Sequence, residues 1–439
     1  MANSTTRKNS MNDIQRWFDE KLKLTNYSIS EIPFELMDKW YFDNIDTNLR
    51  HQKGTFYSIE GIRVTTNYGE TQKWDQPIIN QPEIGILGIL TKVTAGERKY
   101  LMQAKIEPGN VNIIQLSPTV QATESNYKRA HEGKKTIYLE HFLNQLGPVV
   151  IFDRLQTEQG GRFYKKRNRN MLVETKENVD VHEDYRWMNL NEIGALLHID
   201  NFVNMDSRSV LCCVVKREEI DNPLHTTDEI LNWITRLMVK YTLTVELIGL
   251  KNIADWVADE YEIKHVNDSY FRVNAVKVEA STREVTQWCQ PMYKSTEEGL
   301  IGFLVAEIND TLHFLARGIV EVGNIDILHM APTIQCSMYK KRFNGKFKCP
   351  PYTDVFLSAR DNILYDQIQS EEGGRFYHCQ NRHMIVKIDD YKNLKLRDDY
   401  MWVSYNQVLD FTRYGYFNIE GRSLMSCFGL TNQMTVNDG

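Results

Sequence analysis

The sequence predicts an α+β protein built by duplication, with two copies of one domain whose mixed or antiparallel sheets are flanked by a few helices. Three observations predict this class. Long motifs recur at a near-constant spacing, β-rich segments follow the same order in each half, and helix-like segments open and close each half. With 439 residues, 42% of them hydrophobic and 25% charged, the chain has room for two domains with real cores.

The repeat is visible in six motif pairs. Trp74 begins Trp-Asp-Gln-Pro, and Trp288 begins Trp-Cys-Gln-Pro 214 positions later. The other pairs, offset by 213 or 214, begin at Glu107 and Glu321, Ser117 and Ala331, Gln156 and Gln369, Asn168 and Asn381, and Asp206 and Glu420. An offset this constant over such a length excludes chance. We therefore expect one domain over residues 1–220 and a second over residues 221–439, called copy one and copy two below.

Within each copy, β-branched and apolar segments predict strands. They are Thr55–Thr66, Ile84–Val93 and Tyr100–Ile106 in copy one, and Ser269–Val278, Gly299–Ile308 and Leu312–Ile319 in copy two. Helices are expected over Asn189–Leu197 and Ser404–Phe411, introduced by Asn and Ser as caps. The polar stretch Arg217–Thr226 is the expected linker.

Composition excludes several classes of protein. A net charge of −6 leaves no excess of Lys and Arg to meet the phosphates of a nucleic acid or a membrane surface. No apolar run is long enough for a signal peptide or a membrane span. Seven cysteines without a Cys-x-x-Cys spacing indicate reduced thiols and a cytoplasmic protein. The chain lacks phosphate-binding glycine motifs and metal-ligand spacings, so we expect neither a metal nor an organic cofactor.

Trp-x-Gln-Pro has two interpretations. It is a core Trp beside a turn-forming Pro, or an indole that stacks on a nucleobase while Gln reads the base edge. Trp74 and Gln76 carry the motif in copy one, and Trp288 and Gln290 in copy two.

Glu-x-Gly-Asn followed by Pro-Thr-x-Gln is polar and lies between apolar strands. It is either a pair of turns or a rim of amides and hydroxyls that grips sugar hydroxyls. The residues are Glu107, Asn110, Thr119 and Gln121 in copy one, and Glu321, Asn324, Thr333 and Gln335 in copy two.

The densest motif runs through Gly-Gly-Arg-Phe-Tyr to Asn-Arg-x-Met. Its arginines could hold a diphosphate as bidentate donors, or the segment could be a solvated charged strand edge, as Lys165-Lys166-Arg167 alone would suggest. Because the arginines repeat while the lysines do not, we favour a functional role for the arginines. The candidates are Glu158, Arg162, Tyr164, Asn168, Arg169 and Asn170, matched by Glu371, Arg375, Tyr377, Asn381, Arg382 and His383.

One segment separates the copies. Copy one carries Tyr127, Arg129 and His131 after its Pro-Thr-x-Gln element, whereas copy two reads Ser337-Met-Tyr-Lys-Lys-Arg-Phe343. A lone loop histidine is more often incidental than catalytic. Divergence at this one place is nevertheless expected when only one site performs chemistry, so His131 is a catalytic candidate.

Taken together, the motifs resemble the nucleoside-diphosphate-hexose 2,3-dehydratase family. The resemblance is carried by Glu107–Asn112, Gln115–Thr123, Ser125–Tyr127, Asn168–Met171 and Asp200–Met205, and in copy two by Met330–Cys336, Ser370–His378 and Glu420–Ser423. Copy two departs from the family pattern at Val322, where Pro is expected, and around Tyr339–Phe343.

The resemblance implies two tandem Nudix-like modules, a homodimer and two sugar-nucleotide pockets per chain, of which one is catalytic. It implies dTDP-4-keto-6-deoxy-D-glucose as substrate, a 3,4-diketo-2,6-dideoxy sugar nucleotide as product, and a 3-ketoreductase as the next enzyme. The nearest approach to a Nudix box, Arg217–Asp221, lacks the glycines, so metal-dependent hydrolysis is not expected.

The residue types suit a dehydratase. A ketone at C4 acidifies the C3 proton, so elimination needs a base, an acid for the departing hydroxide and donors to the C4 oxyanion. His131, Glu158 and Tyr164 are candidates for acid and base, and Arg129, Asn168 and Asn170 for donors. We expect copy one's motifs, Arg162 included, to line the active pocket and copy two's to form a second, vestigial one. A Nudix-type hydrolase and a non-catalytic sugar-nucleotide-binding protein remain the alternatives.

Overall fold

The structure, a computed structural model, describes residues 2–54, 56–123, 136–143, 145–281, 285–337 and 349–436. Copy one contains α1 (Ala2–Leu24), β1 (Tyr27–Ile32), η1 (Phe34–Leu36), β2 (Trp40–Phe42), β3 (Leu49–His51), β4 (Ser58–Thr66), β5 (Lys73–Asn80), β6 (Ile86–Thr94), β7 (Glu97–Ile106), β8 (Ile114–Ser117), β9 (Val120–Ala122), α3 (Leu139–Phe142), β10 (Val149–Thr157), β11 (Arg167–Glu174), β12 (Tyr185–Met188), α4 (Leu190–Leu196), α5 (Met205–Leu211) and η2 (Cys212–Val214). Copy two contains α6 (Thr227–Lys240), β13 (Leu243–Ile248), η3 (Leu250–Asn252), β14 (Trp256–Ala258), β15 (Glu262–His265), β16 (Phe271–Ala280), β17 (Gln287–Ser295), β18 (Gly299–Ile308), β19 (Thr311–Ile319), β20 (His329–Ala331), β21 (Ile334–Cys336), α8 (Thr353–Ser358), β22 (Ile363–Ser370), β23 (Gln380–Lys387), η4 (Tyr391–Asn393), β24 (Tyr400–Ser404), α9 (Tyr405–Arg413) and α10 (Ile419–Val436). The predicted α+β class is confirmed, and the strands follow the same order in both copies.

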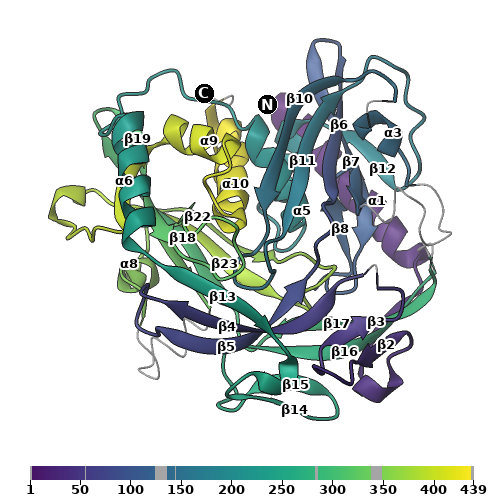
Figure 1. The fold of residues 1–439 in the computed structure, drawn as a ribbon. Coiled ribbons are helices and arrows are strands. Elements are labelled where there is room, and N and C mark those ends of the chain that lie inside the picture. The colour runs from purple at the N-terminus through teal and green to yellow at the C-terminus, as the bar shows by residue number, and fades with distance from the viewer. Residues whose placement is uncertain are drawn as a thin grey trace.

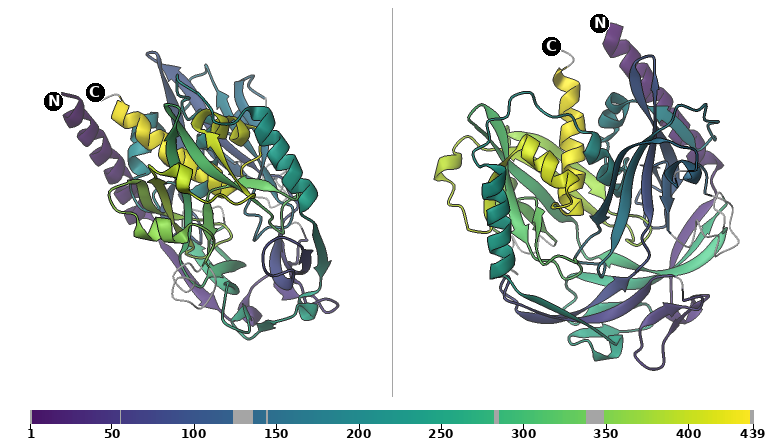
Figure 2. Two further views of the ribbon diagram at one scale, coloured as in Figure 1. Left: turned by 90° about the vertical axis from the view of Figure 1, so that its left-hand side faces the viewer. Right: turned by 45° about the horizontal axis from the view of Figure 1, so that its top comes forward.

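Each copy forms a seven-stranded sheet around one parallel strand pair. In copy one the order is β10-β11-β6-β7-β12, with β8 on β7 and β9 on β6, and among its described strands only β6 and β11 run parallel. Copy two repeats this arrangement, with β18 and β23 as its parallel pair. The two large sheets form separate lobes with α10 between them, and the start of α1 and the end of α10 lie at the same end of the molecule (Figures 1 and 2).

The copies exchange their first strands. Strand β1 of copy one pairs antiparallel with β16 of copy two, from Tyr27 opposite Ala280 to Ile32 opposite Ala275. Reciprocally, β13 of copy two pairs with β4 of copy one. Two five-stranded sheets, each containing strands of both copies, therefore lie below the lobes (Figure 1).

The hydrophobic cores also cross from one copy to the other. The largest joins Ile14 and Leu116 of copy one to Trp233, Phe303 and Phe428 of copy two. A second, between the exchanged sheets, is rich in aromatic side chains of both copies, among them Trp40, Tyr57, Trp256, Tyr293, Phe163 and Phe376. Because burial of apolar surface is the main favourable term in folding, the copies stabilise each other.

The expected helix starts are confirmed. Asn189 caps α4 and Ser404 caps α9, and in each case the residue three positions on, Glu192 or Gln407, completes a capping box. The expected linker, residues 217–226, contains no helix or strand and ends at Thr226, the cap of α6.

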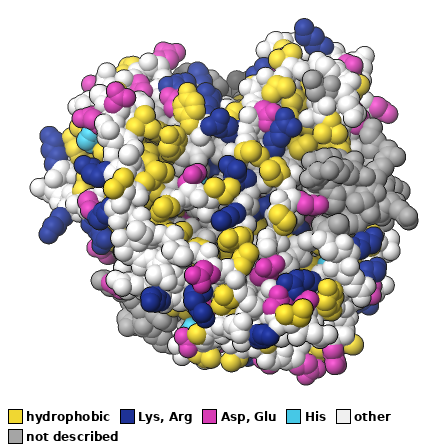
Figure 3. All heavy atoms as spheres, viewed as in Figure 1, with side chains coloured by type: hydrophobic (Ala, Val, Ile, Leu, Met, Phe, Trp, Pro, Cys, Tyr) yellow, Lys and Arg dark blue, Asp and Glu magenta, His cyan; other side chains and the backbone are white. Residues whose placement is uncertain are grey.

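The described surface mixes charges of both signs. On the face shown in Figure 3, Lys and Arg side chains are interspersed with Asp and Glu side chains. Within the described part of the chain, no helix combines the length and apolar character needed to cross a bilayer.

Candidate active site

The site is built where a turn of one copy meets a turn of the other. Gly109, in the Glu-x-Gly-Asn turn of copy one, donates its N–H to the Gly373 carbonyl at 2.6 Å and accepts from the His378 N–H at 2.9 Å. Gly323 contacts Gly160 and Lys165 in the same way. A Cβ on Gly109 would lie 1.7 Å from the carbonyl oxygen of Phe376, so only glycine permits this approach. Each Glu-x-Gly-Asn turn thus contacts the Gly-Gly-Arg-Phe-Tyr turn of the other copy.

The first meeting point gathers eight polar side chains, which we call the copy-one cluster. They are Lys105, Glu107, Gln121, Glu158, Lys166 and Asp206 of copy one with Glu372 and Arg375 of copy two. Gln121 accepts a hydrogen bond from Lys105 Nζ at 2.7 Å and donates to the carboxylates of Glu107 and Asp206. Asn168 donates to Glu158 Oε1 at 2.7 Å and thereby fixes that carboxylate.

Burial shifts the proton affinities of this cluster. It raises the pKa of Glu372 to about 7, assisted by the charges of Glu107 and Glu158 and opposed by Arg375. Burial also raises the pKa of Glu158, and raises that of Asp206 well above its ordinary value with help from the neighbouring carboxylates. Burial lowers the pKa of Lys166 to about 8 although Glu158 opposes the change. The cluster therefore holds acids and bases that exchange protons near neutral pH.

Two atoms of the cluster point to a polar ligand. Glu107 Oε2 and Arg375 Nε are buried, and neither has a hydrogen-bond partner among the described residues. Leaving a buried polar group unpaired costs about 1–3 kcal/mol. The guanidinium of Arg375 also lies 4.0 Å from the centre of the Tyr57 ring, which holds it in place.

The second meeting point, the copy-two cluster, mirrors the first. It contains Glu321, Asn324, Gln335, Glu371, Asn418 and Glu420 of copy two with Gln159 and Arg162 of copy one. Gln335 donates to Glu321 at 3.1 Å and accepts from Asn418 at 2.8 Å. Burial raises the pKa values of Glu321, Glu371 and Glu420.

The structure distributes the arginines across the two copies. The sequence expectation places Arg162 with the motifs of copy one, whereas its charge acts on Glu321 and Glu371 of copy two. Arg375 instead joins copy one's carboxylates, where it acts on Glu372 and Lys166. The cause is the crossed contact between the glycine turns, which carries each arginine to the other copy.

Like the arginines, the aromatic residues of these motifs lie beside the Glu-x-Gly-Asn turn of the other copy. Trp74 and Tyr164 of copy one pack in an apolar group that includes Val322, the neighbour of Glu321. Trp288 and Tyr377 pack beside Tyr27, whose hydroxyl donates to the carbonyl of Pro108, the neighbour of Glu107.

Gln76 and Gln290 hold the glycine turns. Trp74 Nε1 donates to Gln76 Oε1 at 2.9 Å, and Gln76 Nε2 donates to the Gly161 carbonyl at 3.1 Å. Trp288, Gln290 and Gly374 repeat the arrangement, with distances of 2.9 and 2.7 Å. These amides position the loops that carry the arginines.

Several other sequence candidates have structural partners. Thr119 and Thr333 each bridge two strands of their sheets, and Asn170 accepts from Ser209 at 2.8 Å. Arg169 and Arg382 pair with Asp153 and Asp366 across neighbouring strands. Asn110 donates to the Ile113 carbonyl at 3.0 Å within its turn, Asn324 donates to Glu321 at 3.4 Å, and Asn381 donates to Glu371. Tyr127, Arg129 and His131 lie outside the described residues.

Comparison with known proteins identifies the family of the chain. The sequence model of the NDP-hexose 2,3-dehydratase family matches residues 11–214 and again residues 227–428. The chain belongs to this family. The two matches also show two tandem repeats, which confirms the predicted duplication.

Three relatives carry the name dTDP-4-dehydro-6-deoxy-alpha-D-glucopyranose 2,3-dehydratase. The protein from Saccharopolyspora spinosa is 40% identical, over 93% of this chain and 89% of the relative. The protein from Streptomyces violaceoruber is also 40% identical, over 94% and 95% of the two chains. The protein from Amycolatopsis orientalis is 39% identical, over 94% and 89%.

Sequence reasoning missed four residues of the copy-one cluster: Lys105, Lys166, Asp206 and Glu372. The lysine run that contains Lys166 is typical of a solvated strand edge, but the side chain of Lys166 is buried, with a residue exposure of 6%, and donates to the carbonyl of Glu83. Comparison of the two copies could have identified three of these residues. Lys105, Lys166 and Glu372 align with Ile319, Cys379 and Gln159, so each is an ionisable group that the other copy lacks.

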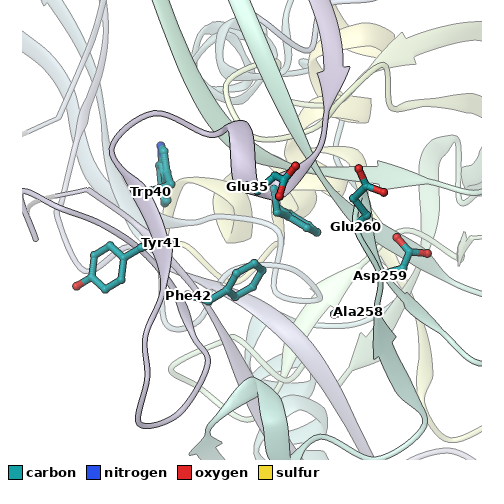
Figure 4. Close-up of a pocket in the computed structure, with 8 residues that line it drawn as sticks. Glu35, Trp40, Tyr41, Phe42, Ala258, Asp259 and Glu260 are labelled. Atoms are coloured by element: carbon teal, nitrogen blue, oxygen red, sulfur yellow. The ribbon is translucent and has the colours of Figure 1, made fainter.

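Two cavities lie away from both clusters. One, of about 360 Å³, lies between residues 34–42 and residues 258–260, with the carboxylates of Glu35, Asp259 and Glu260 to one side (Figure 4). The other, of about 670 Å³, is bordered by α6, α9 and His329. Among the described residues, no group of three or more His, Cys, Asp and Glu side chains is arranged to hold a metal ion.

Proposed function

We propose that this chain removes the C2 hydroxyl of dTDP-4-keto-6-deoxy-D-glucose and yields a 3,4-diketo-2,6-dideoxy sugar nucleotide. Family membership and the names of three relatives support the reaction. We place the reaction at the copy-one cluster, because buried carboxyls, two lysines and an arginine lie together there.

The chemistry matches these groups. A base removes the proton on C3, the electrons pass to the C4 oxygen, and their return expels the C2 hydroxyl as water when an acid protonates it. The enol between C2 and C3 then becomes the C3 ketone. Since the substrate's own ketone accepts the electrons, the reaction needs no organic cofactor.

We further propose that the copy-two cluster binds a sugar nucleotide without turning it over. It retains the glutamate, glutamine and arginine of the copy-one cluster, as Glu321, Gln335 and Arg162, but has Ile319, Cys379 and Gln159 where copy one's cluster has ionisable side chains. The division at residue 220, the Nudix-like character of the repeats, a homodimer, a cytoplasmic location and onward reduction by a 3-ketoreductase remain predictions.

Incubation with the 4-keto substrate tests the function directly. We expect loss of one water from the sugar and an intact dTDP group, with the same rate after exhaustive dialysis against chelator. A Nudix-type hydrolase would release a free nucleotide and depend on a divalent metal, and a binding protein would leave the substrate unchanged. Either result would replace the proposed function.

A further inference from the structure

Comparison of the two clusters shows which of their residues are shared and which differ. Glu107, Gln121, Glu158, Asp206 and Arg375 have direct counterparts in Glu321, Gln335, Glu371, Glu420 and Arg162. Groups present in both clusters cannot by themselves explain why only one should catalyse. Among the residues that define the copy-one cluster, the three charged side chains Lys105, Lys166 and Glu372 align with the uncharged Ile319, Cys379 and Gln159.

The exchange of Gln159 for Glu372 changes how a neighbouring carboxylate is held. In the copy-two cluster Gln159 Nε2 donates to Glu371 Oε2 at 2.9 Å, which is a stable amide–carboxylate pair. In the copy-one cluster the same two positions are Glu372 and Glu158, and each carries a carboxyl. Two buried carboxyls that feel each other's charge cannot both ionise easily, so one retains a proton that it can take up or release.

The exchange of Cys379 for Lys166 places a cation beside this carboxyl pair. The backbone holds both residues in the same way, because the Glu158 N–H donates to the Lys166 carbonyl at 3.1 Å and the Glu371 N–H donates to the Cys379 carbonyl at 2.9 Å. The charges of Glu158, Arg375 and Glu372 all act on the Lys166 ammonium.

Lys105 is the third difference, and it has a different set of contacts. Its ammonium lies 2.7 Å from Gln121 Oε1 and 3.5 Å from Glu107 Oε1. It balances the charge of Glu107 and orients the Gln121 amide. Lys166 and Glu372 are therefore the stronger candidates for proton transfer.

We propose that Glu372, supplied by copy two, is the base that removes the C3 proton, and that Lys166 of copy one is the acid that protonates the departing C2 hydroxyl. The inference rests on the proposed function and deepens it. Glu372 takes the C3 proton while the C3–H electrons form the enolate with C4. The C2–O bond then breaks, Lys166 donates a proton to the leaving hydroxide, and water departs. Return of the proton from Glu372 to Lys166 restores both groups without any change in oxidation state.

The protonation states agree with these roles. Burial places the pKa of Glu372 at about 7 and that of Lys166 at about 8, so between these values the carboxylate and the ammonium are both the major forms. A base and an acid with pKa values near the working pH are the most effective proton-transfer groups.

Exchange of the C3 proton in D₂O separates the two roles. The Glu372→Gln and Lys166→Cys variants give the copy-one cluster the residues of its counterpart, and each should lower turnover by about 10²–10⁴-fold. Glu372→Gln should also stop deuterium entering the 4-keto substrate at C3. Lys166→Cys should continue to exchange the C3 proton while the sugar keeps its C2 oxygen.

Glu60→Gln, at a half-buried carboxyl of strand β4 outside both clusters, is the control and should leave turnover and C3 exchange unchanged. Thermal melting shows which variants fold. If Glu372→Gln or Lys166→Cys does not fold, Glu372→Asp or Lys166→Arg, respectively, takes its place. The opposite pattern, with exchange lost in the Lys166 variant and kept in the Glu372 variant, reverses the roles, and full turnover in either variant overturns the proposal. A wild-type protein that neither exchanges nor dehydrates the substrate refutes the proposed function instead.

Discussion

Arg422, in α10 of copy two, donates a hydrogen bond from Nη2 to the carbonyl oxygen of Thr157 in copy one at 2.6 Å. Thr157 immediately precedes Glu158, so a fully buried arginine of one copy fixes the strand end that presents a carboxylate of the other. Arg208 of copy one does the same for Ser370, the residue before Glu371, also at 2.6 Å. Each cluster therefore contains residues of both copies, and in each cluster an arginine of one copy holds the strand end that carries a glutamate of the other.

Replacement of either arginine should destabilise the fold. Arg422→Met and Arg208→Met each leave buried carbonyl oxygens without donors, so we expect the free energy of unfolding to fall by about 2–4 kcal/mol in each case. Arg422→Met should in addition lower kcat because Glu158 loses its support. Urea denaturation and turnover of the folded fraction measure both effects. Equal kcat values for the two variants would contradict the link between Arg422 and the active cluster.

The arginines of the glycine turns give a prediction opposite to the one the sequence suggests. Arg375→Ala should lower turnover by more than tenfold because Arg375 lies in the copy-one cluster. Arg162→Ala should affect turnover far less, since Arg162 belongs to the other cluster. Steady-state kinetics beside melting temperatures make the comparison. If the Arg162 variant proves the more impaired, the site lies in the copy-two cluster.

The repeat, several of the strands and helices and the family could be predicted because they depend on local patterns that occur twice. Glu107, Gln121 and Glu158 could be identified as polar residues between apolar strands. Their partners could not, because Arg375 reaches Glu107's cluster only through a contact between segments more than 200 positions apart. A lysine run also looks solvated in sequence, whereas Lys166 is buried in the fold.

Strand exchange predicts that neither copy folds alone. Residues 1–220 would lack the strand β13 that pairs with β4, and residues 221–439 would lack the strand β1 that pairs with β16. We expect each half expressed alone to be insoluble or unfolded, and the two halves expressed together to associate and regain turnover. Circular dichroism and size-exclusion chromatography test this. A stable, monomeric half with a cooperative melt would show that the exchanged strands are dispensable.

Close packing of the glycine turns makes a further prediction. In Gly109→Ala the new Cβ would meet the Phe376 carbonyl oxygen at 1.7 Å, so the two turns must separate. We expect a fall in melting temperature and the loss of most turnover, because the separation moves Glu372 and Arg375 away from Glu107. Gly323→Ala, whose Cβ would lie 1.6 Å from the Phe163 carbonyl oxygen, should cost similar stability but retain more kcat per folded molecule. Identical kcat losses would argue that both clusters are needed for turnover.

The last prediction concerns the dependence of stability on pH. Burial raises the pKa of Glu372 from an ordinary value of 4.5 to about 7 in the folded protein. The folded state therefore binds this proton more tightly than the unfolded state, and the resulting stability is fully present below pH 4.5 and is lost as the pH rises through 7. Lys166 does not contribute to the change in the free energy of unfolding below pH 7, because its lowered pKa of about 8 keeps it mainly protonated there in both the folded and the unfolded state.

Glu372→Gln carries no such charge, so its stability relative to the wild type should increase between pH 5 and pH 8. The difference in the free energy of unfolding should reach the order of 1–3 kcal/mol in favour of the variant at pH 8. Urea denaturation of both proteins at several pH values measures it, with Glu60→Gln, at a half-buried carboxyl of strand β4, as the control for a general charge effect. A constant difference across this range would mean that Glu372 ionises normally in the fold. A base kept at this pKa lowers stability at the pH where it works, so the variant that gains stability should be the one that loses turnover.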